Sequence, residues 1–290
     1  RSKIPFTING IGLVANMILD PLFIFVFDWK TDGAALATWL AQACVFGLFV
    51  YQLKFKKILW EDFRFLGKLK SIYTKKIIKI GLPVATLNTL FAFVNMFLGR
   101  TASTVGGHIG LMAMTTSGQI EAITWNTSQG FSTALSAFVA QNYAARKISR
   151  VMKALKSTLY MTLVFGTLCS LLFIFYGNNV FAIFVPEKEA YEAGGLALRI
   201  DGYSQLFMML EIVIQGVFYG MGRTIPPAII SISCNYLRIP MAMLFVSFGW
   251  GLPGIWWTIC ITSIIKGIII LIWFLTIKKK TLDKLAKQEI

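Results

Sequence analysis

The feature that most constrains this chain is a succession of long apolar stretches, separated by short polar or basic segments. A helix that crosses about 30 Å of hydrocarbon needs about 20 mainly apolar residues. Eight stretches meet this requirement, at residues 5–27, 34–53, 80–99, 111–138, 155–177, 198–222, 226–248 and 255–277. Because the mean hydropathy is +0.68, the sequence predicts an all-α integral membrane protein with eight transmembrane helices.

The basic residues indicate how the predicted helices are oriented. A net charge of +15 would be compatible with nucleic-acid binding if the basic residues formed one surface. Instead they gather in every second connecting segment, at the N-terminus, 54–79, 146–156, Arg223 and 278–287. Since this asymmetry marks cytoplasmic loops, we expect both ends of the chain to be cytoplasmic. We expect segment 54–79 either to lie on anionic lipid or to be surrounded by water alone. We expect no nucleic-acid partner.

The chain has few residues suited to catalysis. Its single histidine, His108, falls in a predicted external loop, so Ser–His–Asp and Cys–His arrangements are not supported. The four cysteines lie within predicted spans and show no CxxC spacing, which gives no support to disulfides or zinc. We therefore predict a non-enzyme that needs no cofactor.

A repeated pattern suggests an internal duplication. Residues 16–21 read NMILDP and residues 235–240 read NYLRIP, and each is followed by an apolar run, a short loop and a Gly that opens another span. Both copies start from the predicted cytoplasmic side, which is typical of parallel repeats. The pattern predicts two six-helix lobes: residues 1–53 as the last two helices of the N-terminal lobe, 54–79 as a basic linker and 80–290 as the six-helix C-terminal lobe. The start of the first lobe would then precede Arg1.

An acidic residue inside the first span is a candidate ion site. Asn16 and Asp20 are four residues apart, on one helical face. Pro21 has no N–H, which frees the Met17 carbonyl. Hard oxygen ligands of this kind suit Na⁺, and the carboxylate alone would carry a proton. The structural alternative is a kinked helix with an Asp that caps or pairs.

Two stripes of polar, aromatic and Met side chains recur at helical spacing in the predicted C-terminal lobe, and each contains one Glu. They suggest a wet cleft for bulky organic cations. Alternatively, Glu121 or Glu211 pairs structurally with Arg238 or Lys266. The predicted cleft residues are Asn88, Glu121, Trp125, Gln129, Met208, Glu211 and Gln215.

These residues lie in stretches that resemble the multidrug and toxic compound extrusion (MATE) family of bacterial transporters. The similarity runs through nearly the whole chain in family order, from the fifth helix to the twelfth. The matching stretches are ANMILDPLFIFVFDWKTDGAALATWLAQ (15–42), GLP (81–83), SAFVAQNYAARK (136–147), QGVFYGMGRT (215–224) and LRIPMAMLF (237–245).

The resemblance implies a monomeric exporter in the bacterial plasma membrane that exchanges organic cations for Na⁺ or H⁺ by alternating access. It also implies that Thr38 joins Asn16 and Asp20 in a cation site, possible for Na⁺. Another branch of the family uses acids where this chain has Phe91 and Met208, so a C-terminal ion site is not carried over.

Two other functions fit parts of the pattern. A flippase of lipid-linked saccharide precursors has a related architecture, but its cavity needs several cationic groups to hold a pyrophosphate. A non-transporting membrane assembly or receptor protein would explain the apolar spans, but not the repeated Asn and Pro or the buried acids. We therefore favour the antiporter over both.

Overall fold

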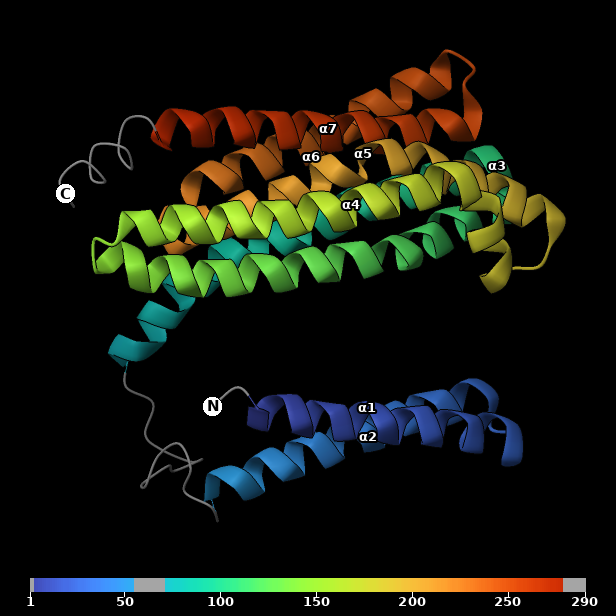
Figure 1. Cartoon of the computed structure of the whole chain (residues 1–290). Coiled ribbons are helices and arrows are strands. Elements are labelled where there is room, and N and C mark those ends of the chain that lie inside the picture. The colour runs from blue at the N-terminus through green and yellow to red at the C-terminus, as the bar shows by residue number, and fades with distance from the viewer. Residues whose placement is uncertain (1–2, 55–70, 279–290) are drawn as a thin grey trace. The chain divides into compact units, whose positions relative to one another are not determined.

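The computed structural model describes residues 3–54 and 71–278, and all regular elements within these ranges are helices (Figure 1). This confirms the prediction of an all-helical fold for the described residues. The elements are α1 (Lys3–Pro21), a π-helical turn η1 (Leu22–Val26), α2 (Lys30–Lys54), α3 (Ser71–Ala144), α4 (Ile148–Phe184), α5 (Lys188–Gly220), α6 (Ile225–Ser247) and α7 (Gly251–Ile277).

Five of the described helical segments are long and apolar enough to cross a membrane. The predicted stretches 80–99 and 111–138 both lie within α3, and 198–222 corresponds mainly to α5. The number of membrane crossings therefore stays a prediction. The five segments are Lys3–Val26, Lys30–Lys54, Ile148–Phe184, Ile225–Ser247 and Gly251–Ile277.

The chain divides into two compact units, Arg1–Lys76 and Ile77–Ile290. The predicted linker 54–79 falls largely on residues 55–70, which lie outside the described part of the chain. The first unit is a hairpin of α1 and α2. Gly12 approaches Val45, and Gly33 approaches the backbone of Phe23, so small residues allow the two helices to pack closely.

Pro21 ends the regular α-helix of the first unit. After it the chain continues as the π-helical turn η1, and the Phe27 N–H donates to the Leu22 carbonyl at 3.1 Å. A proline removes the donor that the carbonyl four residues earlier would use, and wide turns are a common response to such a break. The helix therefore changes from α to π type directly after Pro21.

In the second unit, α3 consists of two helices joined at Gly107. The backbone there has φ 59° and ψ −145°, a conformation that only glycine adopts without strain. Gly110 lies against the backbone of Ala102, so the two halves of α3 fold back on one another. His108, which the sequence predicts to lie in a loop, is instead helical and lies directly after this break. Its side chain is exposed.

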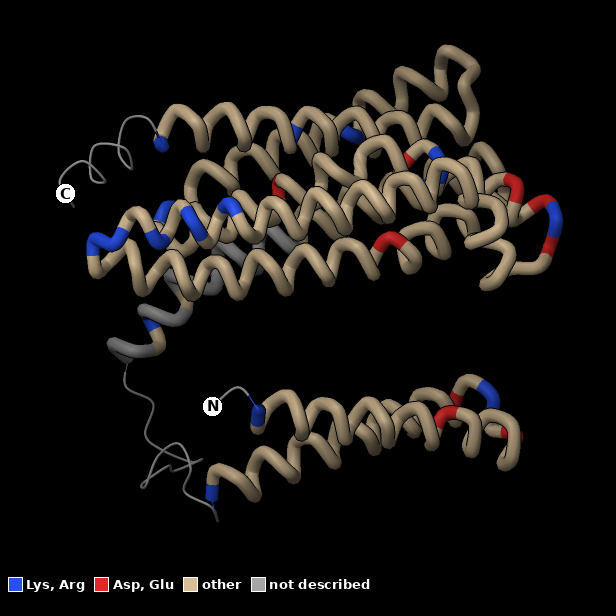
Figure 2. Tube along the Cα trace, in the orientation of Figure 1, with Lys and Arg blue, Asp and Glu red and all other residues tan. Residues whose placement is uncertain are grey.

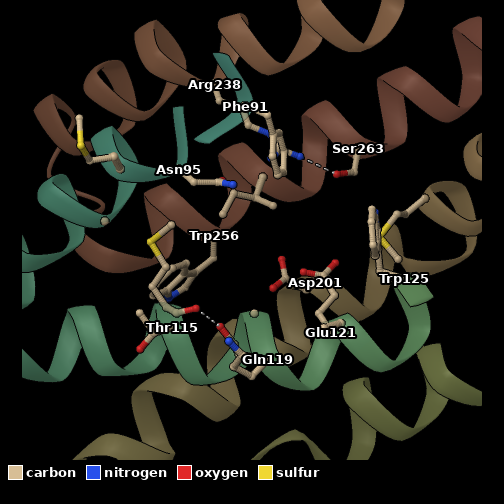
Figure 3. A pocket seen from close by; sticks show the side chains of 18 of the residues that line it. Phe91, Asn95, Thr115, Gln119, Glu121, Trp125, Asp201, Arg238, Trp256 and Ser263 are labelled. Atoms are coloured by element: carbon tan, nitrogen blue, oxygen red, sulfur yellow. Dashed lines mark hydrogen bonds between the residues drawn. The ribbon is translucent and has the colours of Figure 1, made fainter. Parts of the chain in front are cut away.

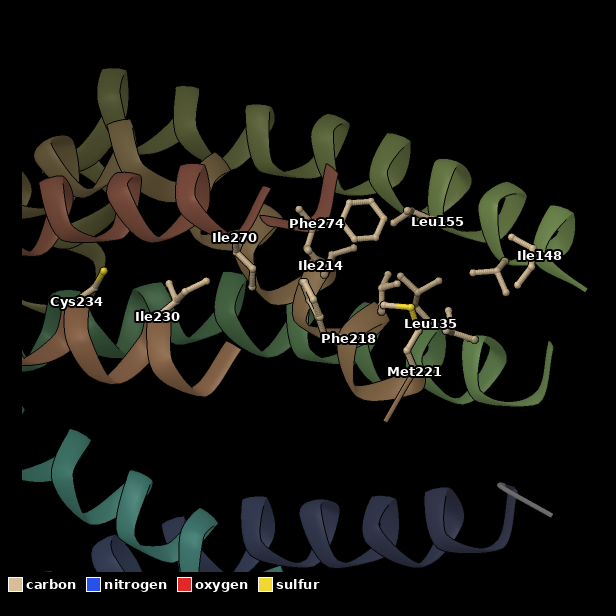
Figure 4. Packing of buried hydrophobic residues seen from close by; sticks show 14 residues of the cluster. Leu135, Ile148, Leu155, Ile214, Phe218, Met221, Ile230, Cys234, Ile270 and Phe274 are labelled. Atoms are coloured by element: carbon tan, nitrogen blue, oxygen red, sulfur yellow. The ribbon is translucent and has the colours of Figure 1, made fainter. Parts of the chain in front are cut away.

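The core of the second unit forms around α5, which is buried along most of its length. Gly216 and Gly220 of α5 lie against the backbone of Ser132 and Ser136, so the two helices meet through small residues at matching spacing. Val213, Val217, Phe218 and their neighbours fill the space between α3, α4, α6 and α7 (Figure 4). This packing holds α5, which carries several ionisable residues, inside the unit.

The outer surface of α4 is apolar, whereas charges lie near its ends. Leu168 and Phe175 are more than half exposed, as expected for side chains that face lipid. The basic residues from Arg146 to Lys156 gather where α4 begins, and acidic residues from Glu187 to Glu192 lie near its other end (Figure 2). That the basic end of α4 is cytoplasmic stays a prediction.

Candidate functional site

The second unit contains an open cavity of about 1030 Å³ between both halves of α3 and helices α5, α6 and α7 (Figure 3). Aromatic and Met side chains form much of its wall. They are Phe91, Met96, Met114, Trp125, Met208 and Trp256. Five ionisable residues that lie away from the helix ends also line the cavity: Glu121, Asp201, Glu211, Arg238 and Lys266. Ionisable residues at membrane depth are rare, and they usually face a cavity or a partner.

Glu121, on the second half of α3, is held by hydrogen bonds from neutral groups. Gln205 Nε2 donates to Glu121 Oε1 at 3.0 Å, and Thr124 Oγ1 donates to Gln205 Oε1 at 2.9 Å. Gln205 is fully buried, so its amide has no access to water in place of these partners. The network orients the Glu121 carboxyl without neutralising its charge.

Asp201 of α5 is a site residue that the sequence reasoning missed. Its side chain is 4% exposed, and its Oδ1 atom has no hydrogen-bond partner. Figure 3 shows its carboxyl group beside that of Glu121, facing the cavity. The signal was available, because Asp201 lies seven residues, about two helical turns, before Met208 and therefore on the same face of α5.

Glu211 and Lys266 form an ion pair across α5 and α7. Lys266 Nζ lies 3.2 Å from Glu211 Oε2, and both side chains are largely buried. The other oxygen, Oε1, accepts hydrogen bonds from Gln215 Nε2 at 2.8 Å and Ser231 Oγ at 3.3 Å. The structural alternative from the sequence therefore applies to Glu211: in this structure its charge is matched by a fixed cation.

Arg238 of α6 is bound by hydroxyl groups of α7. Its Nε donates to Thr262 Oγ1 at 3.0 Å, and one terminal nitrogen donates to Ser263 Oγ at 3.1 Å. Thr262 and Ser263 are adjacent in sequence, yet both reach Arg238 because the guanidinium spreads its donors over a plane. The described residues form two ion pairs, Lys188–Glu192 and Lys266–Glu211, and Arg238 belongs to neither.

The structure distributes the predicted cleft residues over two cavities. Glu121, Trp125, Met208 and Glu211 line the large one. Gln129 and Gln215 line a smaller cavity of about 230 Å³, which shares Trp125 and Lys266 with the large one. The side chain of Asn88 lies outside the described part of the structure. That these residues bind substrate stays a prediction.

The predicted ion site lies in the first unit. Asn16 Nδ2 donates to Asp20 Oδ1 at 3.3 Å, and both side chains are half-buried. The Thr38 hydroxyl donates to the Ala34 carbonyl of its own helix at 3.0 Å. The α1–α2 packing contacts place Thr38 at about the level of Asp20 along the hairpin.

Asp20 forms no ion pair with any described residue. The described residues also contain no cluster of three or more His, Cys, Asp or Glu side chains that could hold a metal. An ion at Asp20 would therefore rely on neutral oxygens, among them the Asn16 amide, the Thr38 hydroxyl and the Met17 carbonyl. Their joint role stays a prediction.

Comparisons with known proteins connect this fold to a family. The MatE family model matches residues 82–244. "Probable multidrug resistance protein NorM" of Thermotoga maritima is 25% identical over 301 residues, which cover 100% of this chain and 63% of that protein. "Multidrug export protein MepA" of Staphylococcus aureus (strain MSSA476) is 24% identical over 268 residues, which cover 88% of this chain and 57% of that protein.

A solved structure shares the fold. The "Outward-facing conformation of a multidrug resistance MATE family transporter of the MOP superfamily" aligns with a TM-score of 0.78 and 21% identity, over 96% of this chain and 62% of that one. This chain thus spans less than two thirds of the length of the relatives described here. Because the family model covers more than half of the chain, the protein belongs to the MatE, or multidrug and toxic compound extrusion, family of membrane transporters.

Proposed function

We propose that this protein is a secondary active multidrug efflux antiporter, which exports organic cations in exchange for Na⁺ or H⁺ by alternating access. The observation that carries the proposal is the cavity of the second unit. Its volume of about 1030 Å³ exceeds what a single small metabolite needs and falls at the upper end of the range for drug-sized ligands. The family membership and the names of the relatives support efflux of more than one compound.

The cavity wall has the chemistry that an organic cation requires. Glu121 and Asp201 place two carboxyl groups on one side, which can attract a cation. Trp125 and Trp256 supply aromatic faces, which attract cations. Met96, Met114 and Met208 are flexible and polarisable, so that the same wall can adapt to ligands of different shape.

The coupling ion would bind in the first unit, at Asp20 with Asn16, Thr38 and the Met17 carbonyl. Asp20 has no basic partner among the described residues, so a mobile cation or a proton can balance its charge. Glu211, in contrast, already has Lys266 at 3.2 Å. A site that exchanges ions needs a carboxylate that a resident cation does not occupy.

We propose that the two sites are coupled indirectly. Residues 1–53 and 80–290 would belong to different lobes of a six-plus-six helix protein, with both ends of the chain cytoplasmic. Binding of the ion would favour one conformation and binding of the drug the other, through bending at Pro21. When one monovalent drug leaves as one monovalent ion enters, the effect of the membrane potential, about 2.3 kcal/mol per charge per 100 mV, cancels to first order.

A flippase of lipid-linked saccharide precursors is the second candidate, because Arg238 and Lys266 place basic groups in the cavity. A pyrophosphate would need several uncompensated cations. Lys266 is neutralised by Glu211, and Arg100, which also lines the cavity, is exposed. Among the described wall residues, Arg238 is then the one buried basic residue outside an ion pair, and a single guanidinium is too few for a pyrophosphate, which favours the antiporter.

The test is ethidium transport by the protein expressed from its complete gene and reconstituted in liposomes. Sodium and pH gradients are imposed separately. We expect at least one gradient to drive transport, and Asp20→Asn to abolish the response. Asp28→Asn is the matched control, because Asp28 is exposed and its positive φ of 53° also suits Asn. Equal ethidium fluxes with and without both gradients would contradict the proposal.

A further inference from the structure

The outer face of α4 carries a basic segment that continues directly into an apolar one. Lys153, Lys156 and Tyr160 are exposed on this face. The apolar side chains of Val164 and Leu168 follow them and are also exposed. Because these positions recur at intervals of three or four residues, they share one side of the helix. The opposite side of α4 packs into the core of the second unit.

The basic residues at the start of α4 have no acidic counterpart in this part of the sequence. Five basic residues lie between Arg146 and Lys156, whereas no Asp or Glu occurs between Glu121 and Glu187. None of the five takes part in an ion pair with another described residue. Figure 2 shows them gathered at one end of the helix. This surface therefore attracts anions, and phosphate is the anion that a membrane surface supplies.

The spacing along α4 fits the depth of one membrane leaflet. Tyrosine favours the boundary between hydrocarbon and headgroups, and Tyr160 is 69% exposed. At about 1.5 Å per residue, Lys156 lies about 6 Å and Lys153 about 10 Å from Tyr160 along the helix axis. Leu168 lies about 12 Å from Tyr160 in the other direction, within the roughly 15 Å of hydrocarbon in one leaflet. The long lysine side chains can reach back to the headgroups.

This face lies apart from the proposed transport site. Neither the large cavity nor the small one is lined by a residue of α4. In a membrane transporter, an apolar helix face that is exposed and borders no cavity is expected to meet lipid. The basic segment and the apolar segment together provide contacts for both parts of one lipid molecule, its phosphate and its hydrocarbon chain.

We propose that the outer face of α4 is a binding site for an anionic phospholipid. The lipid phosphate lies at Lys153 and Lys156, and an acyl chain lies along Val164 and Leu168. Tyr160 lies between them, at the level of the lipid glycerol. The site is separate from the proposed antiport and does not depend on it. It distinguishes anionic lipids from neutral ones that have the same chains.

The experiment measures lipid binding by native mass spectrometry of the detergent-purified protein, expressed from its complete gene. Phosphatidylglycerol and phosphatidylcholine with identical acyl chains are titrated separately. We expect the wild type to bind its first phosphatidylglycerol about tenfold more tightly, a modest preference because the lysines are exposed and screened by salt. In the double variant Lys153→Gln/Lys156→Gln, the two affinities are expected to differ by less than about threefold.

Two controls separate this site from general attraction between charges. The double variant Lys3→Gln/Lys54→Gln removes the same charge from exposed positions at the start of α1 and the end of α2, and it is expected to keep the tenfold preference. Glycerol phosphate, which has the headgroup charge without acyl chains, is expected not to displace phosphatidylglycerol at equal concentration. All four replaced side chains are exposed, so both variants are expected to fold, which circular dichroism checks.

Three results would overturn the inference. The first is a wild type that binds both lipids equally. The second is a preference for phosphatidylglycerol that survives in the α4 variant or falls equally in the control variant, because binding would then follow net charge alone. The third is displacement by glycerol phosphate at equal concentration, which would indicate a site for soluble anions. None of these readings depends on whether ethidium is transported.

Discussion

The two regions that carry acidic residues differ in how their charge is balanced. In the first unit, Asp20 accepts a side-chain hydrogen bond from Asn16 at 3.3 Å and forms no ion pair with a described residue. In the second unit, Glu211 has a lysine at 3.2 Å and two further donors. The comparison separates an acid without a basic partner among the described residues, as the proposed ion site requires, from one that is held in a buried ion pair beside a cavity.

The largest effect on stability is expected from Lys266→Met in the second unit. It leaves the Glu211 carboxylate buried without its cation, which costs about 3–5 kcal/mol of unfolding free energy. Thermal or denaturant unfolding in detergent, followed by tryptophan fluorescence, measures the loss. Adding Glu211→Gln removes the uncompensated charge and is expected to restore most of the stability. A single variant as stable as the wild type would show that the pair is not buried as described.

A smaller effect is expected from Gln205→Leu. This change removes the donor to the Glu121 carboxyl, while Thr124 keeps the Glu121 backbone carbonyl as an acceptor at 2.7 Å. A buried group left unpaired costs about 1–3 kcal/mol. The same unfolding assay applies. Gln119→Leu is a useful control, because Gln119 also lines the cavity but no described hydrogen bond joins its side chain to Glu121. Equal losses in both variants would speak against a specific Glu121–Gln205 network.

Asp20→Asn is expected to change the stability by less than about 1 kcal/mol, because the single hydrogen bond at 3.3 Å is weak and an amide can replace it. The contrast with Lys266→Met sharpens the distinction between the two regions. The unfolding measurement is made beside the ion-driven transport assay described above. A loss of stability as large as that of Lys266→Met would indicate that Asp20, like Glu211, mainly supports the structure.

The smallest change in stability is expected from Thr38→Val, within about 0.5 kcal/mol, because the hydroxyl is exposed and donates only to Ala34 of its own helix. If Thr38 helps Asp20 to hold Na⁺, the apparent affinity for the ion in transport falls severalfold. Thr7→Val is a matched control, since Thr7 makes the same kind of bond, to Lys3. Equal ion affinities in both variants would remove Thr38 from the proposed site.

Much of the site could be predicted where the relevant residues lie on one helix. Asn16 and Asp20, or Glu211 and Gln215, are four residues apart, so helical geometry alone brings them together. Glu121 and Asp201 belong to different helices, and their meeting depends on how α3 and α5 are rotated and aligned. Asp201 lies seven residues before Met208 on the same face of α5, so helical spacing could have indicated it.

The sequence by itself determined the all-helical character, the apolar surface expected for a membrane and the family. These follow from hydropathy, charge distribution and short motifs, which are local or additive along the chain. Only the tertiary structure decided that Lys266 pairs with Glu211, that Arg238 binds Thr262 and Ser263, and that Asp201 faces the cavity. The physical reason is that each of these arrangements depends on how two or more helices are rotated and aligned relative to one another. A shift of one residue along a helix turns a side chain by about 100° around the helix axis, which is enough to remove it from its partner.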